Sequence, residues 1–113
     1  MTRSSNPCTH FLPWDCENFV RCVLELKGYD ILEYDEWGYD IRARYPGGVY
    51  DYYIEVKCGP GARLSPFQRE FRDSVIMARE EFDIPVKFVL CQFDDKGNLI
   101  ADNECRRLLR PYI

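Results

Sequence analysis

Two charged residues stand two positions apart in a segment that otherwise has the composition of a buried strand. The segment is YYIEVKCGP, residues 52–60, and it carries Glu55 and Lys57. Residues two apart in a strand face the same way, so the two side chains share one face of a sheet. A buried charge is costly unless it is paired or holds a metal. The pair is therefore either a chance ion pair on a partly exposed strand or part of a chemical site.

Two further carboxylates can reach the same end of that sheet. Asp40 lies in the preceding strand segment, and Glu17 lies at the edge of the apolar face of the first predicted helix. Oxygen ligands of this kind suit Mg²⁺ or Mn²⁺, with water and a substrate phosphate in the remaining positions. Lys57 could then orient or deprotonate a metal-bound water, or stabilise charge on the phosphate. Taken alone, E-x-K on a strand is a weak signal, because many solvated strand faces carry such pairs.

The elements that must position these residues follow from capping residues and periodicity. Asp15 and Gly28 mark the start and the end of a first helix, and Ser65 opens a second helix over 65–82. Alternation predicts strands at 29–36, 38–45, 49–57, 86–93 and 99–101, with one or two final helical turns at 103–110. Because the second helix joins two strands of one sheet, the strand after it is expected to pair in parallel. The predicted fold is α/β (α+β), a mixed sheet flanked by helices.

The length and composition indicate one folded domain. Of 113 residues, 46% are hydrophobic and 15% aromatic, so disorder is not expected beyond the polar first dozen. We predict a flexible segment over 1–12 and a single domain over 13–113. The expected core stripe of the second helix consists of Phe67, Phe71, Val75, Ala78 and Phe82. A net charge of −4 argues against a sequence-blind coat for nucleic acid, and no apolar run is long enough to span a membrane.

Six cysteines allow three interpretations: free thiols, a disulfide framework or a zinc site. Disulfide frameworks are typical of small secreted chains, and the polar N-terminal stretch lacks the apolar segment of a signal peptide. Zinc sites usually contain C-x-x-C pairs, and this chain has none. Cys16, Cys22 and Cys91 lie in apolar periodic segments, where free cysteines act as small hydrophobes. We therefore predict free thiols and a reducing intracellular compartment, cytoplasm or nucleus.

Several short motifs resemble the PD-(D/E)XK nuclease superfamily. These are GYDI at 38–41, IEVK at 54–57 after a hairpin, and the helical opening ENFVRCVLELKGYDIL. The stretch IEVKCGPGARLSPFQ further resembles the virus-type replication-repair nuclease branch. The resemblance spans about residues 14–93 and implies a restriction-endonuclease-like α-β-β-β-α-β core. One departure is Tyr39, which stands where the superfamily pattern has a proline before its first acidic residue.

The resemblance implies a metal-dependent endonuclease or exonuclease that hydrolyses phosphodiester bonds with Mg²⁺ or Mn²⁺, with DNA favoured over RNA as the substrate. The catalytic residues it implies are Asp40, Glu55, Lys57, Glu17 and Gln68, and the metal ligands are Asp40, Glu55 and Val56. Capping geometry alone already explains a glutamine at position 68. The alternative is a catalytically inactive nuclease-fold module that binds nucleic acid or a partner protein.

Three arginines are candidates for contacts with a nucleic-acid backbone: Arg63, Arg69 and Arg72. Arg69 and Arg72 are three apart near the start of the second helix, where the helix dipole also favours phosphate. A simpler interpretation is a solvated helix face, balanced by Glu70, Asp73, Glu80 and Glu81. A homodimer is also compatible with the sequence, and the short strand at 99–101 is one candidate edge for it.

Overall fold

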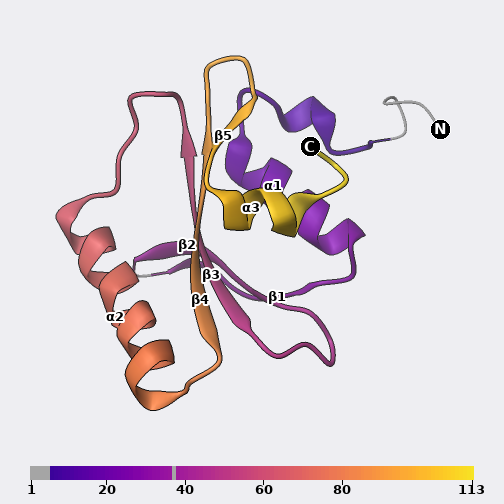
Figure 1. The fold of residues 1–113 in the computed structure, drawn as a ribbon. Helices are drawn as coiled ribbons and strands as arrows, with labels where there is room; N and C mark the ends of the chain where they lie inside the picture. Colours follow the sequence, from indigo (N-terminus) through magenta and orange to yellow (C-terminus); the bar gives the residue numbers. More distant parts are fainter. Residues whose placement is uncertain (1–5, 37) are drawn as a thin grey trace.

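A five-stranded mixed sheet with three α-helices forms the domain (Figure 1). The computed structural model describes residues 6–36 and 38–113. Its elements, in chain order, are η2 (Thr9–Phe11), α1 (Cys16–Leu26), β1 (Asp30–Glu36), β2 (Tyr39–Arg44), β3 (Asp51–Cys58), α2 (Pro66–Phe82), β4 (Val86–Phe93), β5 (Leu99–Ala101) and α3 (Asn103–Leu109). The predicted order of helix, three strands, helix and strand is confirmed. Within the described ranges, no helix is long and apolar enough to cross a membrane.

The strands lie across the sheet in chain order, from β1 to β5. Neighbouring strands are antiparallel except for β3 and β4, which run parallel with Glu55 opposite Leu90 and Lys57 opposite Gln92. The helix α2 makes the crossover that a parallel pair requires. The expectation of a parallel strand after the second helix is therefore confirmed.

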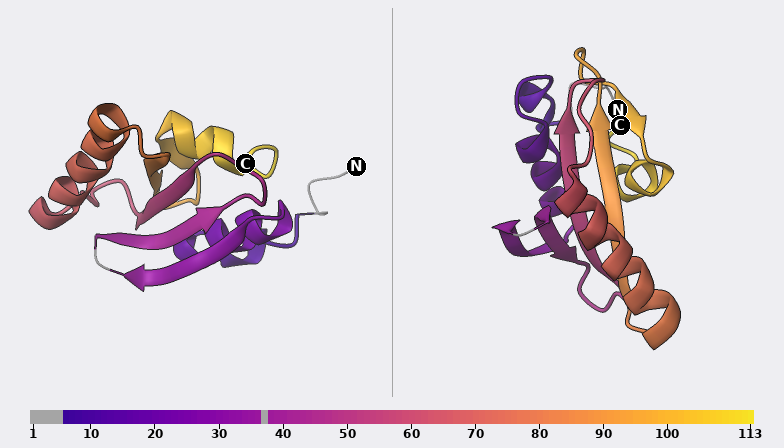
Figure 2. Two further views of the ribbon diagram at one scale, coloured as in Figure 1. Left: turned by 90° about the horizontal axis from the view of Figure 1, so that it is seen from below. Right: turned by 90° about the vertical axis from the view of Figure 1, so that its left-hand side faces the viewer.

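Helices cover both faces of the sheet. On one face, the ring of Phe93 in β4 contacts Phe19 of α1, with 5.8 Å between ring centroids. The ring of Phe88, which alternation places on the other face, lies 6.2 Å from Phe71 of α2. In Figure 1 the strands accordingly stand between α2 on the left and α1 on the right, and in the right-hand view of Figure 2 α2 lies in front of the strands.

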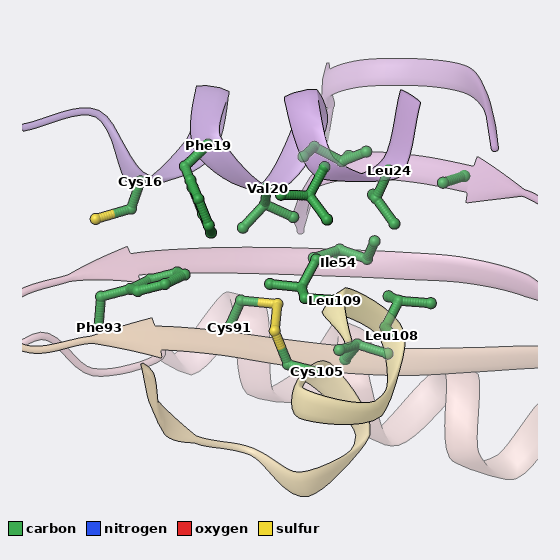
Figure 3. Close-up of a cluster of buried hydrophobic side chains, with 14 of the residues drawn as sticks. Cys16, Phe19, Val20, Leu24, Ile54, Cys91, Phe93, Cys105, Leu108 and Leu109 are labelled. Carbon is green, nitrogen blue, oxygen red and sulfur yellow. A yellow bond between two sulfur atoms is a disulfide. The ribbon is translucent and has the colours of Figure 1, made fainter. Parts of the chain in front are cut away.

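The main core lies on the α1 face and also includes α3. Its side chains come from α1, β2, β3, β4 and α3, and those labelled in Figure 3 meet in one cluster. Phe19, Leu24 and Ile54 are among its fully buried members. This face therefore supplies most of the apolar area that the chain removes from water on folding.

The predicted core stripe of α2 holds in the middle of the helix, where Phe71 and Ala78 are partly buried beside Val75, and is wrong at its two ends. Only Val75 of this helix is buried, whereas Phe67 is 47% exposed and Phe82 is 66% exposed. The reason is that α2 packs mainly along β4 and does not cross the centre of the sheet. Phe71 is the aromatic residue of α2 that reaches the sheet, where it contacts Tyr39, Tyr53 and Phe88.

The prediction of free thiols is also wrong, because all six cysteines form disulfides. The pairs are Cys8–Cys22, Cys16–Cys58 and Cys91–Cys105. A buried cysteine in an apolar periodic segment is compatible with either state, and the partners are brought together only by the tertiary fold. Because disulfides persist chiefly in oxidising environments, the cysteines no longer support a reducing compartment.

Part of the segment predicted to be flexible packs on the domain. Residues 1–5 lie outside the described residues, but Cys8 is fully buried and η2 packs against α1. The Asn6 side chain donates a hydrogen bond from Nδ2 to the Tyr112 carbonyl, 3.0 Å away. The described part of this segment therefore belongs to the folded unit and lies beside the C-terminal end.

Candidate active site

Asp40, Glu55 and Lys57 share the face of the sheet opposite α1. Ile41 of β2 pairs with Ile54 of β3, and both are fully buried in the core beneath α1. Because side chains alternate along a strand, Asp40 and Glu55 point to the other face, and Lys57 lies two residues further along that face. The predicted convergence of these three residues is therefore present in the structure.

Direct contacts link the three residues. The Asp40 and Glu55 side chains are hydrogen-bonded to each other. Lys57 Nζ lies 3.5 Å from Glu55 Oε2. The backbone N–H of Val56 donates a hydrogen bond to Asp40 Oδ2 at 2.7 Å. This bond ties the start of β2 to β3 at the point where the acidic residues meet.

Burial changes the protonation of this cluster. Glu55 is only 3% exposed and is the buried charged residue of the described chain, whereas the Lys57 side chain is 20% exposed. Burial, followed by the hydrogen bond and the negative charge of Asp40, raises the pKa of Glu55 to about 8, against a smaller opposing effect of Lys57. Near neutral pH, Glu55 therefore keeps its proton in most molecules.

The donor set fits a hard divalent cation. Mg²⁺ is usually held by one or two carboxylates, with waters and substrate phosphates completing its shell. Asp40 and Glu55 supply two carboxylates. The N–H of Val56 points toward Asp40, and the N–H and C=O of one strand residue point to the same side, so the Val56 carbonyl faces that side too. A cation here would replace the proton on Glu55.

The third predicted carboxylate, that of Glu17, does not complete a metal-binding group. Among the described residues there is no cluster of three or more His, Cys, Asp or Glu side chains that could hold a metal. Glu17 nevertheless lies nearby along the chain, because its neighbour Cys16 is bonded to Cys58, the neighbour of Lys57, with 5.8 Å between the bridged Cα atoms. The Cα atoms of Glu17 and Lys57 are therefore at most about 13 Å apart.

Gln68 acts as a helix cap in this structure. Its Oε1 accepts a hydrogen bond from the Ser65 N–H at 2.8 Å, and its own N–H donates to Ser65 Oγ at 3.1 Å. These contacts form the capping box that the sequence predicts. They account for the glutamine without any contact to substrate.

The three predicted arginines differ in their contacts. Arg69 donates from Nη1 to the Leu64 carbonyl at 2.9 Å, and Arg72 pairs with its neighbour Asp73 at 3.2 Å. Arg72 also lines a cavity of about 330 Å³ beside β4. Arg63 is exposed in the loop that follows β3. Of the three, Arg63 is the one closest to Lys57 along the chain.

Sequence reasoning missed an aromatic wall beside the site. The rings of Tyr39, Tyr53 and Phe71 contact one another, with centroid distances of 4.9 to 5.4 Å. Gly38 permits this approach, since a Cβ at that position would lie 2.6 Å from Cγ of Phe71. Alternation identifies Tyr53 as facing the same way as Glu55, and the expected core stripe of α2 includes Phe71, but neither signal shows that these rings meet beside the acidic residues.

A second missed residue is Gln92, which stands opposite Lys57 in the parallel register of β3 and β4. Its amide contacts the loop after Lys57, as described below. The available signal is a polar residue in a mainly apolar strand, and Lys87 in the same strand gives the same signal.

Comparison with protein-family models, with curated proteins and with solved structures gives no match for this chain.

Proposed function

We propose that this chain is a metal-dependent nuclease with a restriction-endonuclease-like core, as the PD-(D/E)XK resemblance suggests. The observation that carries the proposal is the buried Glu55, hydrogen-bonded to Asp40 and 3.5 Å from Lys57. Burying a carboxyl group beside a second one lowers stability, and a carboxyl group as strongly perturbed as that of Glu55 is typical of functional sites.

Each residue has a distinct role in the proposed reaction. Asp40, Glu55 and the Val56 carbonyl would hold Mg²⁺ or Mn²⁺. When bound, the metal would polarise the phosphate of the substrate and lower the pKa of a water molecule bound to it. Lys57 would donate to the phosphate oxygens or orient the attacking water, and its contact with Glu55 keeps the ammonium group in place.

Protonation sets a condition on this activity. The proton on Glu55 must leave before both carboxylates can bind a cation, since metal ligands act in their deprotonated form. With the pKa of Glu55 raised to about 8, metal affinity should increase as the pH rises from 6 to 9. The raised pKa thus favours an alkaline optimum.

The proposed substrate is nucleic acid, with DNA favoured over RNA. A chain of net charge −4 does not attract a polyanion over its whole surface. Contacts must therefore come from local cations, which here are the bound metal, Lys57 and the exposed Arg63.

The deciding experiment is a cleavage screen with single-stranded, duplex and branched DNA and with RNA. Each substrate is incubated with Mn²⁺, with Mg²⁺ and with chelator. We expect metal-dependent cutting that falls roughly 10²- to 10⁴-fold in the Lys57→Met protein.

Lys87→Met is the matched control, because Lys87 lies on the neighbouring strand and pairs with Glu104 at 3.5 Å, outside the site. This variant should cut as the wild type does. Cutting that survives Lys57→Met, or none at all by folded wild-type protein, would contradict the proposal.

One observation favours the second candidate, an inactive module that binds nucleic acid or a partner protein. It is that no group of three metal-binding side chains forms within 6–36 and 38–113. Such a module should bind labelled oligonucleotide or its partner equally well with and without chelator. An active nuclease should bind the oligonucleotide more tightly when Ca²⁺ is present as a non-reactive cation.

A further inference from the structure

The loop that follows Lys57 is held in place by one side chain of the neighbouring strand. Gln92 Nε2 donates to the Ala62 carbonyl at 2.8 Å and lies 3.3 and 3.4 Å from the carbonyls of Gly59 and Pro60. A single amide group thus contacts three backbone carbonyls within four residues of one loop. The segment concerned, residues 59–63, is called the β3–α2 loop below.

Gln92 also belongs to the face that carries the candidate site. It is the register partner of Lys57, and partners in parallel strands point to the same face. The side chain therefore stands beside Lys57 and extends along the strand to the loop. Through this residue, the position of the loop is linked to the strand pair that carries the acidic cluster.

The outer side of the loop is open. A Cβ built on Gly59 or Gly61 would meet nothing within 4 Å, and Arg63 is exposed. The inner side is occupied, because the Gly59 N–H donates to the Phe93 carbonyl at 2.7 Å and the Ala62 N–H to the Gly59 carbonyl at 3.3 Å. Glycines let a backbone approach a ligand closely, and an arginine suits phosphate.

We propose that the β3–α2 loop contacts the phosphodiester backbone of the substrate, and that Gln92 is the positioning residue that keeps the loop in its binding conformation. The proposal rests on the proposed function. A loop already ordered before binding loses less conformational freedom when the substrate arrives. Removal of the amide should therefore weaken binding and leave the acidic cluster unchanged.

The first test measures the loop itself. Gln92→Met preserves side-chain length and removes the donor. We expect the Ala62 amide to exchange its hydrogen about three- to tenfold faster in this variant, which corresponds to the loss of one hydrogen bond. The Gly97 amide, which donates to the Asp94 carbonyl at 3.1 Å in the turn between β4 and β5, serves as an internal reference. Its exchange rate should not change.

The second test measures binding in a background that cannot cut. A labelled single-stranded or duplex DNA is titrated, in Ca²⁺, into Lys57→Met protein and into Lys57→Met/Gln92→Met protein. We expect the Kd to rise about three- to tenfold in the double variant. The binding of Mn²⁺ should change by less than twofold. Lys57→Met/Lys87→Met is the matched control and should bind the DNA as Lys57→Met does.

The outcomes separate the two proposals. Unchanged exchange at Ala62 would overturn the role of Gln92, and faster exchange with an unchanged Kd would overturn the substrate contact. Absence of any DNA binding by folded protein would also overturn it. Binding that depends on Gln92, together with no cutting by wild-type protein, would support the loop proposal while refuting the nuclease.

Discussion

The two faces of the sheet carry different kinds of residues. The α1–α3 face holds the apolar cluster and all three disulfides, each of which involves α1, α3 or the segment before α1. The α2 face holds the acidic pair, Lys57, an aromatic wall and a helix with one buried residue. One face therefore stabilises the fold, and the other carries groups whose burial lowers stability.

This division explains how a chain of this size can bury the carboxyl group of Glu55 beside that of Asp40. A small domain has only about 5–15 kcal/mol of net stability, and one badly placed charge can consume much of it. Disulfides add stability mainly by restricting the unfolded chain. They allow Glu55 to remain buried without a larger apolar core.

The largest effect should come from removing the disulfides. By the chain-entropy relation, Cys16–Cys58, which closes a loop of 42 residues, contributes about 4 kcal/mol, and each 14-residue pair contributes about 3 kcal/mol. Full reduction should therefore unfold the protein at room temperature. Loss of near-ultraviolet circular dichroism on addition of a thiol reductant would show it.

Paired serine variants sharpen this prediction. Cys16→Ser/Cys58→Ser should lower the free energy of unfolding in urea by more than Cys8→Ser/Cys22→Ser does, because its loop is longer. A reduced protein that stays folded with full stability would show that the α1–α3 face does not depend on its cross-links.

A second, smaller effect concerns pH and Glu55. Between pH 4.5 and about 8 the folded protein holds a proton on Glu55 that the unfolded chain has lost. The free energy of unfolding should therefore fall as the pH rises through this window, by a few kcal/mol, and level off above it. Urea unfolding in chelator at several pH values measures the slope.

Glu55→Gln should flatten that slope and make the protein more stable than wild type at pH 9, because an amide does not ionise. Saturating Mn²⁺ should raise the stability of the wild type at pH 9 and leave this variant nearly unaffected. Glu104→Gln, at a half-buried position paired with Lys87, is the control and should keep the slope. An equal slope in Glu55→Gln would rule out Glu55 as its origin.

The smallest effect is expected on the outer side of α2. Phe82→Ser should change the free energy of unfolding by less than about 0.5 kcal/mol, because this ring is 66% exposed. Val75→Ala in the same helix should cost about 1–2 kcal/mol, since Val75 is its buried residue. A cost for Phe82→Ser that equals that of Val75→Ala would show that α2 buries more than this structure indicates.

The helices and strands are predictable from the sequence, because caps and alternation depend on residues that are close along the chain. The cap at Asp15 and the capping box at Ser65 are present, and strand alternation placed Glu55 and Lys57 on one face. The hairpin and the E-x-K spacing were enough to bring Asp40 to Glu55, since register follows from the turn.

Long-range pairings were not predictable in the same way. Six cysteines admit fifteen pairings, and burial alone does not distinguish a thiol from half of a disulfide. The apolar stripe of α2 likewise does not determine where the helix lies over the sheet, and so does not predict which of its apolar residues are buried. Helical periodicity predicts that Glu17 faces the sheet, because it shares a helix face with core residues. It does not predict how far the carboxylate of Glu17 lies from Asp40 and Glu55.

The hydrogen bond between Asn6 and Tyr112 has a consequence for how this molecule could be rebuilt. Because Asn6 and Tyr112 are in contact, a short linker between these two positions could close the folded unit into a ring, and the turn at 46–48 could be opened instead. Synthesis would then begin with β3, α2 and β4, the unit with parallel strands. Asp40 and Glu55 would stand near opposite ends of that chain, so the acidic pair would form only when the last strand to be synthesised docked beside the first.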